Sequence, residues 1–327
     1  MPQHASPPEP LPELETIMKK PTLIALCLLA LLTGCASGPQ IDRSFSAKGQ
    51  SSRVKFVVLH YTVSNTPGSL RTLTQEVVSS HYLVTDDAKP VVYGLVDENR
   101  QSNHAGVSSW KNYTLLNGSS IGIEIVNPGF TKGPEGRIWH PFPQAQIDRV
   151  IALVKDIVAR HQIPPENILG HADIAPMRKQ DPGPLFPWIQ LAQQGLVTWP
   201  DALKVAALRP QFELAPPDTA WFQKKLAGVG YTTPQNGELD AATRASMVAF
   251  QMKYRPSLFD GSPDAETAAL LETLVPTPPP PPAPPVPTMS PALAVPVAPA
   301  ATAAPATPPA PAVPAPVPDL PAVPVEH

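Results

Sequence analysis

The chain has 327 residues, which is enough for about two domains of ordinary size. Hydrophobic residues make up 43% of it, so a packed core is possible, and the formal charge of -3 argues against a nucleic-acid-binding protein. The 47 prolines are concentrated toward the C-terminus. Both cysteines, Cys27 and Cys35, lie near the N-terminus, so a disulfide framework is excluded and any metal site must use histidines and carboxylates.

The N-terminal segment has the pattern of a secretory signal. Lys19 and Lys20 supply positive charge, and the apolar stretch 22–32 follows them. This stretch is shorter than the ~20 apolar residues that a membrane-spanning helix needs. We therefore expect residues 1–35 to be a signal segment, with Met18 as the true start of translation. An uncleaved membrane anchor is the alternative.

The signal ends in LTGC, which resembles the lipobox of bacterial lipoproteins. This resemblance implies cleavage before Cys35 and lipidation of that cysteine. Ala36, where an aspartate would direct retention, implies sorting to the outer membrane. Several acyl chains are enough for stable anchoring. Residues 36–52 are polar and contain many glycines and serines, so they are expected to form a tether.

Residues 53–205 are expected to form an α/β domain. Short runs rich in apolar and β-branched residues predict strands, and apolar residues at helical spacing predict helices. The expected strands cover residues 54–59, 91–96 and 120–126, and the expected helices cover residues 69–80 and 144–160. Helices that alternate with strands favour a central mixed β-sheet flanked by helices.

Residues 215–275 predict a small C-terminal three-helix domain. Its helices are expected at residues 220–227, 240–254 and 265–274. Asp240 is expected to cap the second helix, and glycines separate the three. From Pro276 onward 21 of 52 residues are proline, so residues 276–327 are expected to be a disordered Pro/Ala-rich tail. Its composition suits a passive spacer as well as a partner-binding tail.

Two of the eight histidines stand where metal ligands are commonly found. His60 ends the apolar strand FVVL, and strand ends are frequent site positions in α/β sheets. His171 follows the apolar run ILG, and Asp181 lies ten residues further on. Two neutral imidazoles and one carboxylate suit catalytic zinc, because they leave its fourth tetrahedral position open. The spacing of these residues alone does not establish such a site.

Five motifs, in order along the chain, resemble those of a known family. They are VVLHYTVS, SHYLVTDD, NHAGVSSW, SIGIEIVNPG and GHADIAPMRKQDPGPLFPW. Together they resemble the type-2, AmpD-like N-acetylmuramoyl-L-alanine amidases, and among these the AmiD-type outer-membrane lipoproteins. FQKKLAGVGY, GELDAATRASMVAFQ and FDGSPDAET resemble the peptidoglycan-binding domain that is often joined to such enzymes. The resemblance implies the fold of these amidases and of peptidoglycan recognition proteins.

Carried over by motif, His60, His171 and Asp181 match the family's zinc ligands, with one zinc ion per chain. Glu124 in IGIEI matches its general base, and Lys179 matches the basic residue near the third ligand. The resemblance then implies that Glu124 moves a proton from water to the leaving amine and that Lys179 faces the developing oxyanion. The alternatives are a structural ion pair for Glu124 and a solvated loop charge for Lys179.

Tyr61, His81, His104 and Asn117 are expected to contact the substrate. For His81 and His104 the alternative is a structural role, or support of the zinc ligands from behind.

The resemblance implies a zinc-dependent N-acetylmuramoyl-L-alanine amidase. Such an enzyme hydrolyses the amide between N-acetylmuramic acid, including its anhydro form, and L-alanine of the peptidoglycan stem peptide, in cell-wall turnover or recycling. Its expected partners are peptidoglycan, muropeptides and, through the lipid anchor, the outer membrane, with a monomeric enzyme facing the periplasm. Two competing interpretations are an inert muropeptide-recognition protein and a tether between the outer membrane and the wall.

Overall fold

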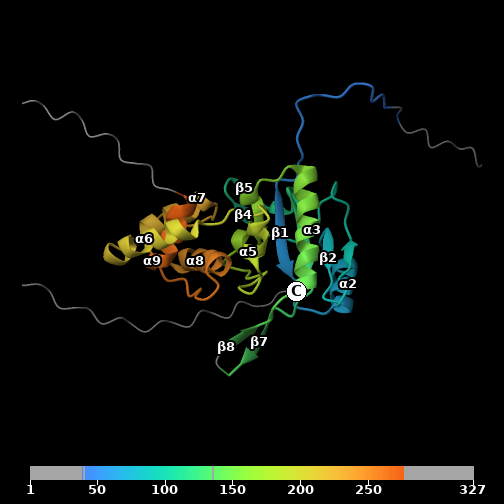
Figure 1. Cartoon of the computed structure of the whole chain (residues 1–327). Coiled ribbons are helices and arrows are strands. Elements are labelled where there is room, and N and C mark those ends of the chain that lie inside the picture. The colour runs from blue at the N-terminus through green and yellow to red at the C-terminus, as the bar shows by residue number, and fades with distance from the viewer. Residues whose placement is uncertain (1–38, 40, 135, 276–327) are drawn as a thin grey trace, which may run out of the picture. The chain divides into compact units, whose positions relative to one another are not determined.

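The structure is a computed structural model, which describes residues 39, 41–134 and 136–275 (Figure 1). The predicted signal segment with Cys35 and the predicted tail at 276–327 lie outside the described residues. Residues 41–50, within the predicted tether, form no helix or strand and are exposed. Within the described ranges, none of the helices is both long and apolar enough to cross a membrane.

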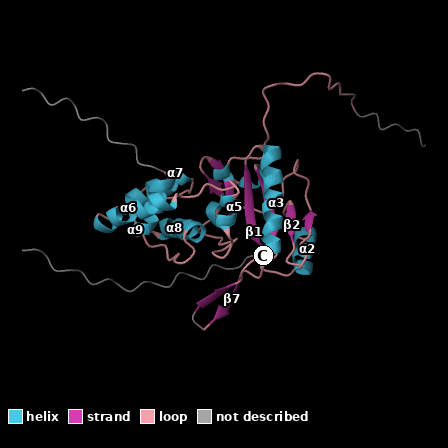
Figure 2. Cartoon of the chain, viewed as in Figure 1, coloured by secondary structure: helices cyan, strands magenta, loops and turns pink. Residues whose placement is uncertain are grey.

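A five-stranded sheet runs in the order β3-β2-β6-β1-β9. Figure 2 shows β1 and β2, drawn in magenta, among its strands. Its strands are β1 (Phe56–Tyr61), β2 (Tyr82–Val84), β3 (Val92–Gly94), β6 (Ser120–Ile125) and β9 (Ile168–Gly170). All neighbouring pairs are parallel except β2 and β3, which are antiparallel. The predicted central mixed sheet is confirmed, and the three predicted strands correspond to β1, β3 and β6.

Helix α3 (Gln144–His161) covers one face of this sheet (Figure 1). Its predicted apolar stripe is confirmed, and the buried residues include Ile147, Val150, Val154 and Ile157. They pack with odd-numbered residues of β1 and β6 and with α5 (Trp188–Gln193). Each such side chain contributes about 1.5–3 kcal/mol on burial, so packing holds the helix more firmly than intrinsic propensity does.

The other face of the sheet carries the even-numbered residues of β1 and β6. Phe56 and Val58 are fully buried there, and His60 is next in the same row. α2 (Thr66–Gln75) packs on this side against β2, where its Leu73 joins Leu83 in a small apolar cluster. The apolar row of β1 therefore turns polar just where the strand ends.

Several short elements differ from the prediction. The helix expected at 69–80 begins earlier, because the side chain of Asn65 accepts from the amide of Gly68 and thereby caps α2. Two hairpins were not predicted. They pair β4 (Ser109–Trp110) with β5 (Tyr113–Thr114) and β7 (Phe130–Gly133) with β8 (Gly136–Trp139). The turns η2 (Leu116–Gly118) and η3 (Pro165–Asn167) and the short helix α4 (His171–Ile174) complete this region.

The helical region consists of α6 (Ala202–Leu214), α7 (Thr219–Val229), α8 (Ala241–Tyr254) and α9 (Ala265–Leu274). The last three correspond to the predicted helices, and Asp240 caps α8 as predicted, by accepting from the amide of Thr243 at 2.8 Å. α6 is an additional helix that packs against α9. None of its residues is fully buried, so its sequence has no apolar face of the kind that predicts a helix. Pro210 lies inside it, and proline is unfavourable in a helix interior.

The helical region and the sheet share one hydrophobic core. Phe56, Val58 and Leu169 belong to the same cluster of buried side chains as Phe222 and Phe250. The two regions are therefore packed together through apolar side chains as well as joined by the chain.

Candidate metal centre

His60 and Glu124 lie side by side where β1 and β6 end. They are partners in the parallel ladder, and paired residues point to the same face of a sheet. Gly122 leaves space on this face, since a β-carbon there would lie only 2.4 Å from the ring of His104. The ladder thus places His60 and Glu124 on the face opposite α3, and the ring of His104, from a loop, packs against Gly122 beside them.

His171 and Asp181 come from the segment that follows β9. α4 begins directly at His171, and the amide of Ala172 donates to the carbonyl oxygen of Asp181 at 2.9 Å. Gly170 permits this close return of the chain, because a β-carbon there would lie 2.7 Å from Pro182 and 3.3 Å from the carbonyl oxygen of Asp181. A side chain at position 170 would push the two predicted ligands apart.

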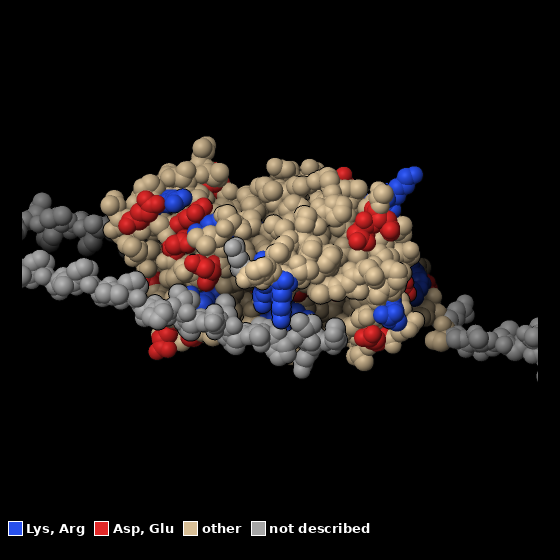
Figure 3. Space-filling view, turned by 90° about the horizontal axis from the view of Figure 1, so that it is seen from below, with Lys and Arg blue, Asp and Glu red and all other residues tan. Residues whose placement is uncertain are grey.

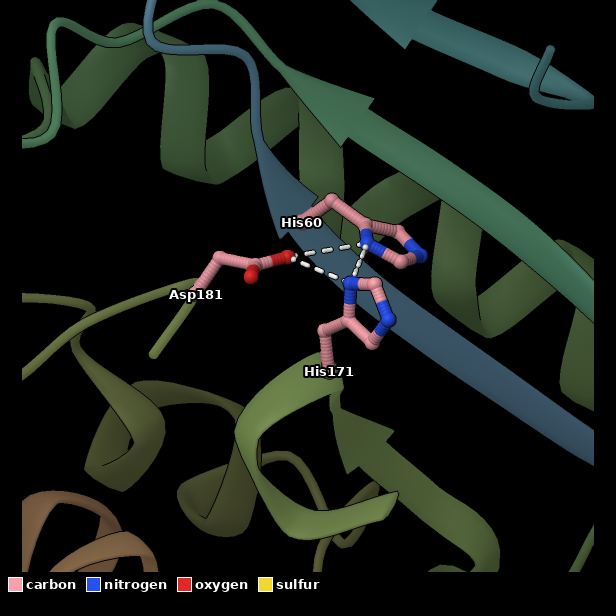
Figure 4. A group of neighbouring side chains, drawn as sticks. All are labelled: His60, His171 and Asp181. Carbon is pink, nitrogen blue, oxygen red and sulfur yellow. Dashed lines mark hydrogen bonds and ion pairs between the residues drawn. The ribbon is translucent and has the colours of Figure 1, made fainter. Parts of the chain in front are cut away.

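Three ligand atoms converge on one point (Figure 4). Nδ1 of His60 lies 3.0 Å from Nδ1 of His171 and 2.9 Å from Oδ2 of Asp181, and the last two atoms are 3.1 Å apart. All three residues are buried. Zinc bonds of about 2.0–2.2 Å separate such atoms by roughly 3.3–3.6 Å, so a shift of a few tenths of an ångström accommodates the ion. The structure thus brings the three predicted ligands together.

The hydrogen bonds around His60 leave its Nδ1 free for a metal. Ser120 donates its hydroxyl to the carbonyl oxygen of Leu116 at 2.6 Å, so its oxygen accepts from Nε2 of His104 at 3.0 Å. Nδ1 of His104 then accepts from Nε2 of His60, also at 3.0 Å. A neutral imidazole has one N–H, which leaves a lone pair on Nδ1 of His60. Burial, together with the nearby His171, lowers the pKa of His60 to about 4 and keeps the ring neutral.

His171 is held in the matching tautomer. Its Nε2 donates to the carbonyl oxygen of Ala105 at 3.1 Å, so its Nδ1 also presents a lone pair. Two lone pairs and a carboxylate oxygen that face one another at about 3 Å repel unless a cation lies among them. The donor set of His60, His171 and Asp181 therefore fits a metal ion.

Glu124 is partly buried, and its Oε2 has no hydrogen-bond partner among the residues that the structure describes. Burial raises the pKa of this carboxyl group well above its ordinary value, and the charge of Asp181 raises it further. Within the described part of the chain no ion pair forms at Glu124, so a structural ion pair does not account for it. An unsatisfied buried oxygen costs about 1–3 kcal/mol, and a carboxyl group perturbed in this way marks a candidate catalytic residue.

Lys179 lies between α4 and Asp181 in the sequence and is partly buried. Its amide donates to the carbonyl oxygen of Ala175 at 2.9 Å, which fixes the backbone. Its charge is close enough to lower the pKa values of both His60 and Glu124. Its partial burial, two residues before Asp181, is consistent with the predicted role and less so with a solvated loop charge, and the role itself stays a prediction.

Three of the four residues expected to contact substrate form hydrogen bonds within the protein around the site. His81 is buried, accepts from the amide of Gly122 at 3.0 Å and faces the carbonyl oxygen of Arg100 with its other ring nitrogen at 3.1 Å. His104 is also buried and has both ring nitrogens engaged. The side-chain oxygen of Asn117 accepts from the amides of His104 and Ala105, at 3.2 and 2.7 Å. This geometry favours the supporting role that was the alternative for the two histidines.

Tyr61 and Arg137 border the metal centre on the side of the β7–β8 hairpin. Arg137 was not predicted, and its Nη1 donates to the side-chain oxygen of Gln180, next to Asp181, at 2.5 Å. Burial and the charge of Asp181 raise the pKa of Tyr61, whereas Arg137 opposes them. Figure 3 shows basic side chains near the middle of the face seen from below in Figure 1. Arg137 is 76 residues after Tyr61, so its position in the sequence gives no sign that it lies near Tyr61 in the fold.

Two parts of the chain match models of known families. Residues 50–184 match the N-acetylmuramoyl-L-alanine amidase family, and residues 216–271 match a putative peptidoglycan binding domain. Over 267 residues the chain is 45% identical to the N-acetylmuramoyl-L-alanine amidase AmiD of Escherichia coli (strain K12). The matched region covers 77% of this chain and 96% of that protein.

Solved structures agree with this assignment. E. coli AmiD in complex with the substrate anhydro-N-acetylmuramic acid-L-Ala-D-gamma-Glu-L-Lys matches with a TM-score of 0.66 at 44% identity, over 72% of this chain and 94% of that one. AmpDh3 from Pseudomonas aeruginosa in complex with anhydromuramic pentapeptide matches with a TM-score of 0.67 at 34% identity, over 72% and 97%. The chain belongs to the N-acetylmuramoyl-L-alanine amidase family, as its motifs predicted.

Proposed function

We propose that this chain hydrolyses the amide between the lactyl group of N-acetylmuramic acid, including the anhydro sugar, and L-alanine of the peptidoglycan stem peptide. The family gives the type of reaction, and the E. coli relative was solved with an anhydro-muramoyl peptide as its substrate. The observation that carries the proposal is the convergence of His60, His171 and Asp181, together with the carboxyl group of Glu124, whose Oε2 has no partner among the described residues.

One zinc ion is the metal that these ligands suit best. Two neutral imidazoles and a carboxylate form a three-ligand set, which is typical of catalytic zinc because it leaves room for water. When bound, zinc supplies positive charge that polarises the carbonyl group and lowers the pKa of water to roughly 7. His104 and Ala105 keep the two ligand imidazoles in the tautomers that this requires.

Glu124 is the residue that we assign to proton transfer. Its raised pKa brings the carboxyl group closer to neutrality than an exposed glutamate, which suits a group that both takes and returns a proton. It takes a proton from the attacking water and delivers it to the nitrogen of the leaving L-alanine. Lys179 supplies positive charge to the carbonyl oxygen as that oxygen becomes negative, a contribution typically of ~10²–10³ in rate.

We further propose that the enzyme is an outer-membrane lipoprotein that faces the periplasm and acts as a monomer. The support for the anchor is in the sequence: a basic start at Lys19 and Lys20, a short apolar stretch and the LTGC motif that ends at Cys35. The match of residues 216–271 to a peptidoglycan-binding model supports a second attachment, to the wall itself.

Hydrolysis is tested by incubating the purified chain with anhydro-muramoyl tripeptide and with intact sacculi, each with zinc and with a chelator. Mass spectrometry should show free stem peptides only in the samples with zinc. The His171→Ala variant, which lacks one ligand, is the matched control. Intact substrate in every sample would instead favour a recognition protein.

The anchor is tested by mass spectrometry of the mature N-terminus from cells and by membrane fractionation. We expect a lipid-modified Cys35 in the outer-membrane fraction and a soluble periplasmic enzyme after Cys35→Ala. An unmodified Cys35, still joined to the segment before it, would overturn the lipoprotein assignment and leave the amidase proposal intact.

A further inference from the structure

A buried ion pair links the helical region to the segment that carries His171. Nζ of Lys253, on α8, lies 2.9 Å from Oδ2 of Asp173, on α4, and the two side chains are only 5% and 3% exposed. The same Nζ donates to the carbonyl oxygen of Ile168 at 3.1 Å and lies 4.3 Å from the centre of the Trp188 ring. Lys253 therefore contacts both β9 and α4. In the sequence His171 lies between Ile168 and Asp173, the two residues that Lys253 contacts there.

Tyr231 binds the other oxygen of the same carboxylate. Its hydroxyl donates to Oδ1 of Asp173 at 2.6 Å, and its ring packs edge to face on Trp110. Gly230 has a φ of 141° and lies so close to Trp110 that a β-carbon would come within 2.4 Å of it. The amide of Gly170 donates to Oδ2 of Asp173 at 2.8 Å. The carboxylate is thus satisfied from both regions of the molecule.

α4 depends on these contacts for its position. It has four residues, and a helix of that length is not stable by itself. Removal of one partner from a buried ion pair leaves an uncompensated buried charge, which is strongly destabilising. Since a ligand must stay within about 0.5 Å of its place, a shift of α4 reaches the metal centre through His171.

We propose that Lys253 and Tyr231 are positioning residues for the ligand His171, acting through Asp173. The helical region is then a structural part of the metal centre, whatever contact it also makes with peptidoglycan. This inference rests on the proposed metal site. It predicts that metal binding and the packing of α8 stabilise each other, because a ligand that binds only the ordered state stabilises that state.

Lys253→Met tests the proposal, since methionine keeps an extended side chain and removes the charge. Zinc affinity, measured by competition with a chromogenic chelator, should fall about 10- to 100-fold. The visible spectrum of the cobalt-substituted protein should also change, because it reports the geometry of the ligands. Lys225→Met is the matched control. Lys225 is comparably buried, pairs with Glu272 and lies over the ring of Trp221, all within the helical region.

The control should lose stability in chemical denaturation and keep zinc affinity within about twofold of the wild type. Tyr231→Phe keeps the ring and removes one hydrogen bond, so it should fold and lose about fivefold in zinc affinity. This variant decides the question if Lys253→Met does not fold.

Unchanged zinc affinity in a folded Lys253→Met or Tyr231→Phe variant would overturn the inference. An equal loss in Lys225→Met would also overturn it, because affinity would then follow general stability. A wild-type chain that binds no zinc would instead overturn the proposed metal site.

Discussion

The two histidines of the metal centre are held in different ways. His60 lies on β1, which has a neighbouring strand on each side, and its ring is fixed by His104 and Ser120 from the same region. His171 begins a four-residue helix after the edge strand β9, and its backbone is supported by Lys253 from the helical region. A strand inside a sheet needs only its side chain oriented, whereas a short helix at an edge needs its backbone held as well.

This difference divides the site into two independently testable halves. Changes behind His60 should alter the orientation and tautomer of a ligand without affecting the helical region. Changes behind His171 should alter metal binding and the packing of α8 together. In the metal centre, His60 is therefore held by residues of its own region, whereas His171 is held by contacts between two regions of the chain.

The largest effect should come from removing a ligand. The loss should then be the same whichever half of the site is changed. His60→Ala and His171→Ala should each reduce hydrolysis to background. Zinc affinity should fall about 300-fold, because roughly a third of a binding free energy on the order of 10 kcal/mol is lost. Chelator competition and mass spectrometry of muropeptide digests check this. Retention of the metal by either variant would remove that residue from the ligand set.

Glu124→Gln should reduce the rate of hydrolysis without changing metal binding by His60 or His171. The amide keeps the shape and removes the proton acceptor, so kcat should fall on the order of 10²–10⁴-fold with zinc affinity unchanged. Glu98→Gln is the control, because Glu98 is bound by Arg160 and His161 on another part of the surface. Steady-state kinetics on anhydro-muramoyl tripeptide measure both. An active Glu124→Gln variant would assign the proton transfer to another group.

His104→Phe should break the half that contains His60. Phenylalanine keeps an aromatic ring at this position, but the ring has no nitrogen to accept from Nε2 of His60. Zinc affinity should therefore fall about 10- to 100-fold. Ser120→Ala, one step further from the metal, should have a smaller effect. Hydrogen exchange of the α8 amides should stay at the wild-type rate, in contrast to Lys253→Met. Faster exchange in His104→Phe would show that the two halves are not independent.

The smallest effect concerns stability and pH. Burial raises the pKa of Glu124 in the folded metal-free chain, so the folded state resists its ionisation. The stability present below the unfolded pKa of about 4.5 is therefore lost as pH rises through the folded pKa. Glu124→Gln should make the metal-free chain more stable by about 1–3 kcal/mol at pH 7, and this gain should vanish below about pH 4. Urea denaturation with a chelator present measures it, and a constant gain at all pH values would contradict ionisation as the cause.

The elements that the sequence predicted well carry their own pattern. β1 begins with a continuous apolar run, β6 repeats isoleucine at every second position, α3 has an apolar stripe, and α8 has an aspartate at its cap. α6 escaped because its residues are partly or fully exposed and Pro210 lies inside it. The two-residue strands β4 and β5 pair only because the surrounding chain holds them together. Their sequences carry no comparable signal.

For the site, motif resemblance supplied the ligands, and their convergence required the fold. Asp173 is two residues from His171 and drew no attention, because its partners Tyr231 and Lys253 are 58 and 80 residues away. For His104 the sequence left open a substrate contact or support of a zinc ligand, and in the structure its Nδ1 lies 3.0 Å from Nε2 of His60. A histidine that supports a ligand and one that contacts a substrate look the same in a sequence.

By itself the sequence determined the chemistry and the local elements: which residue types could bind a metal, which segments alternate or repeat as strands and helices, and which family the motifs resemble. Only the tertiary structure decided which nitrogen of each histidine faces the centre, that Oε2 of Glu124 has no partner within the described ranges, and that Lys253 of the helical region pairs with Asp173 on α4. The physical reason is that tautomers, desolvation and buried ion pairs depend on neighbours brought together by folding. These neighbours are distant along the chain, so no local pattern records them.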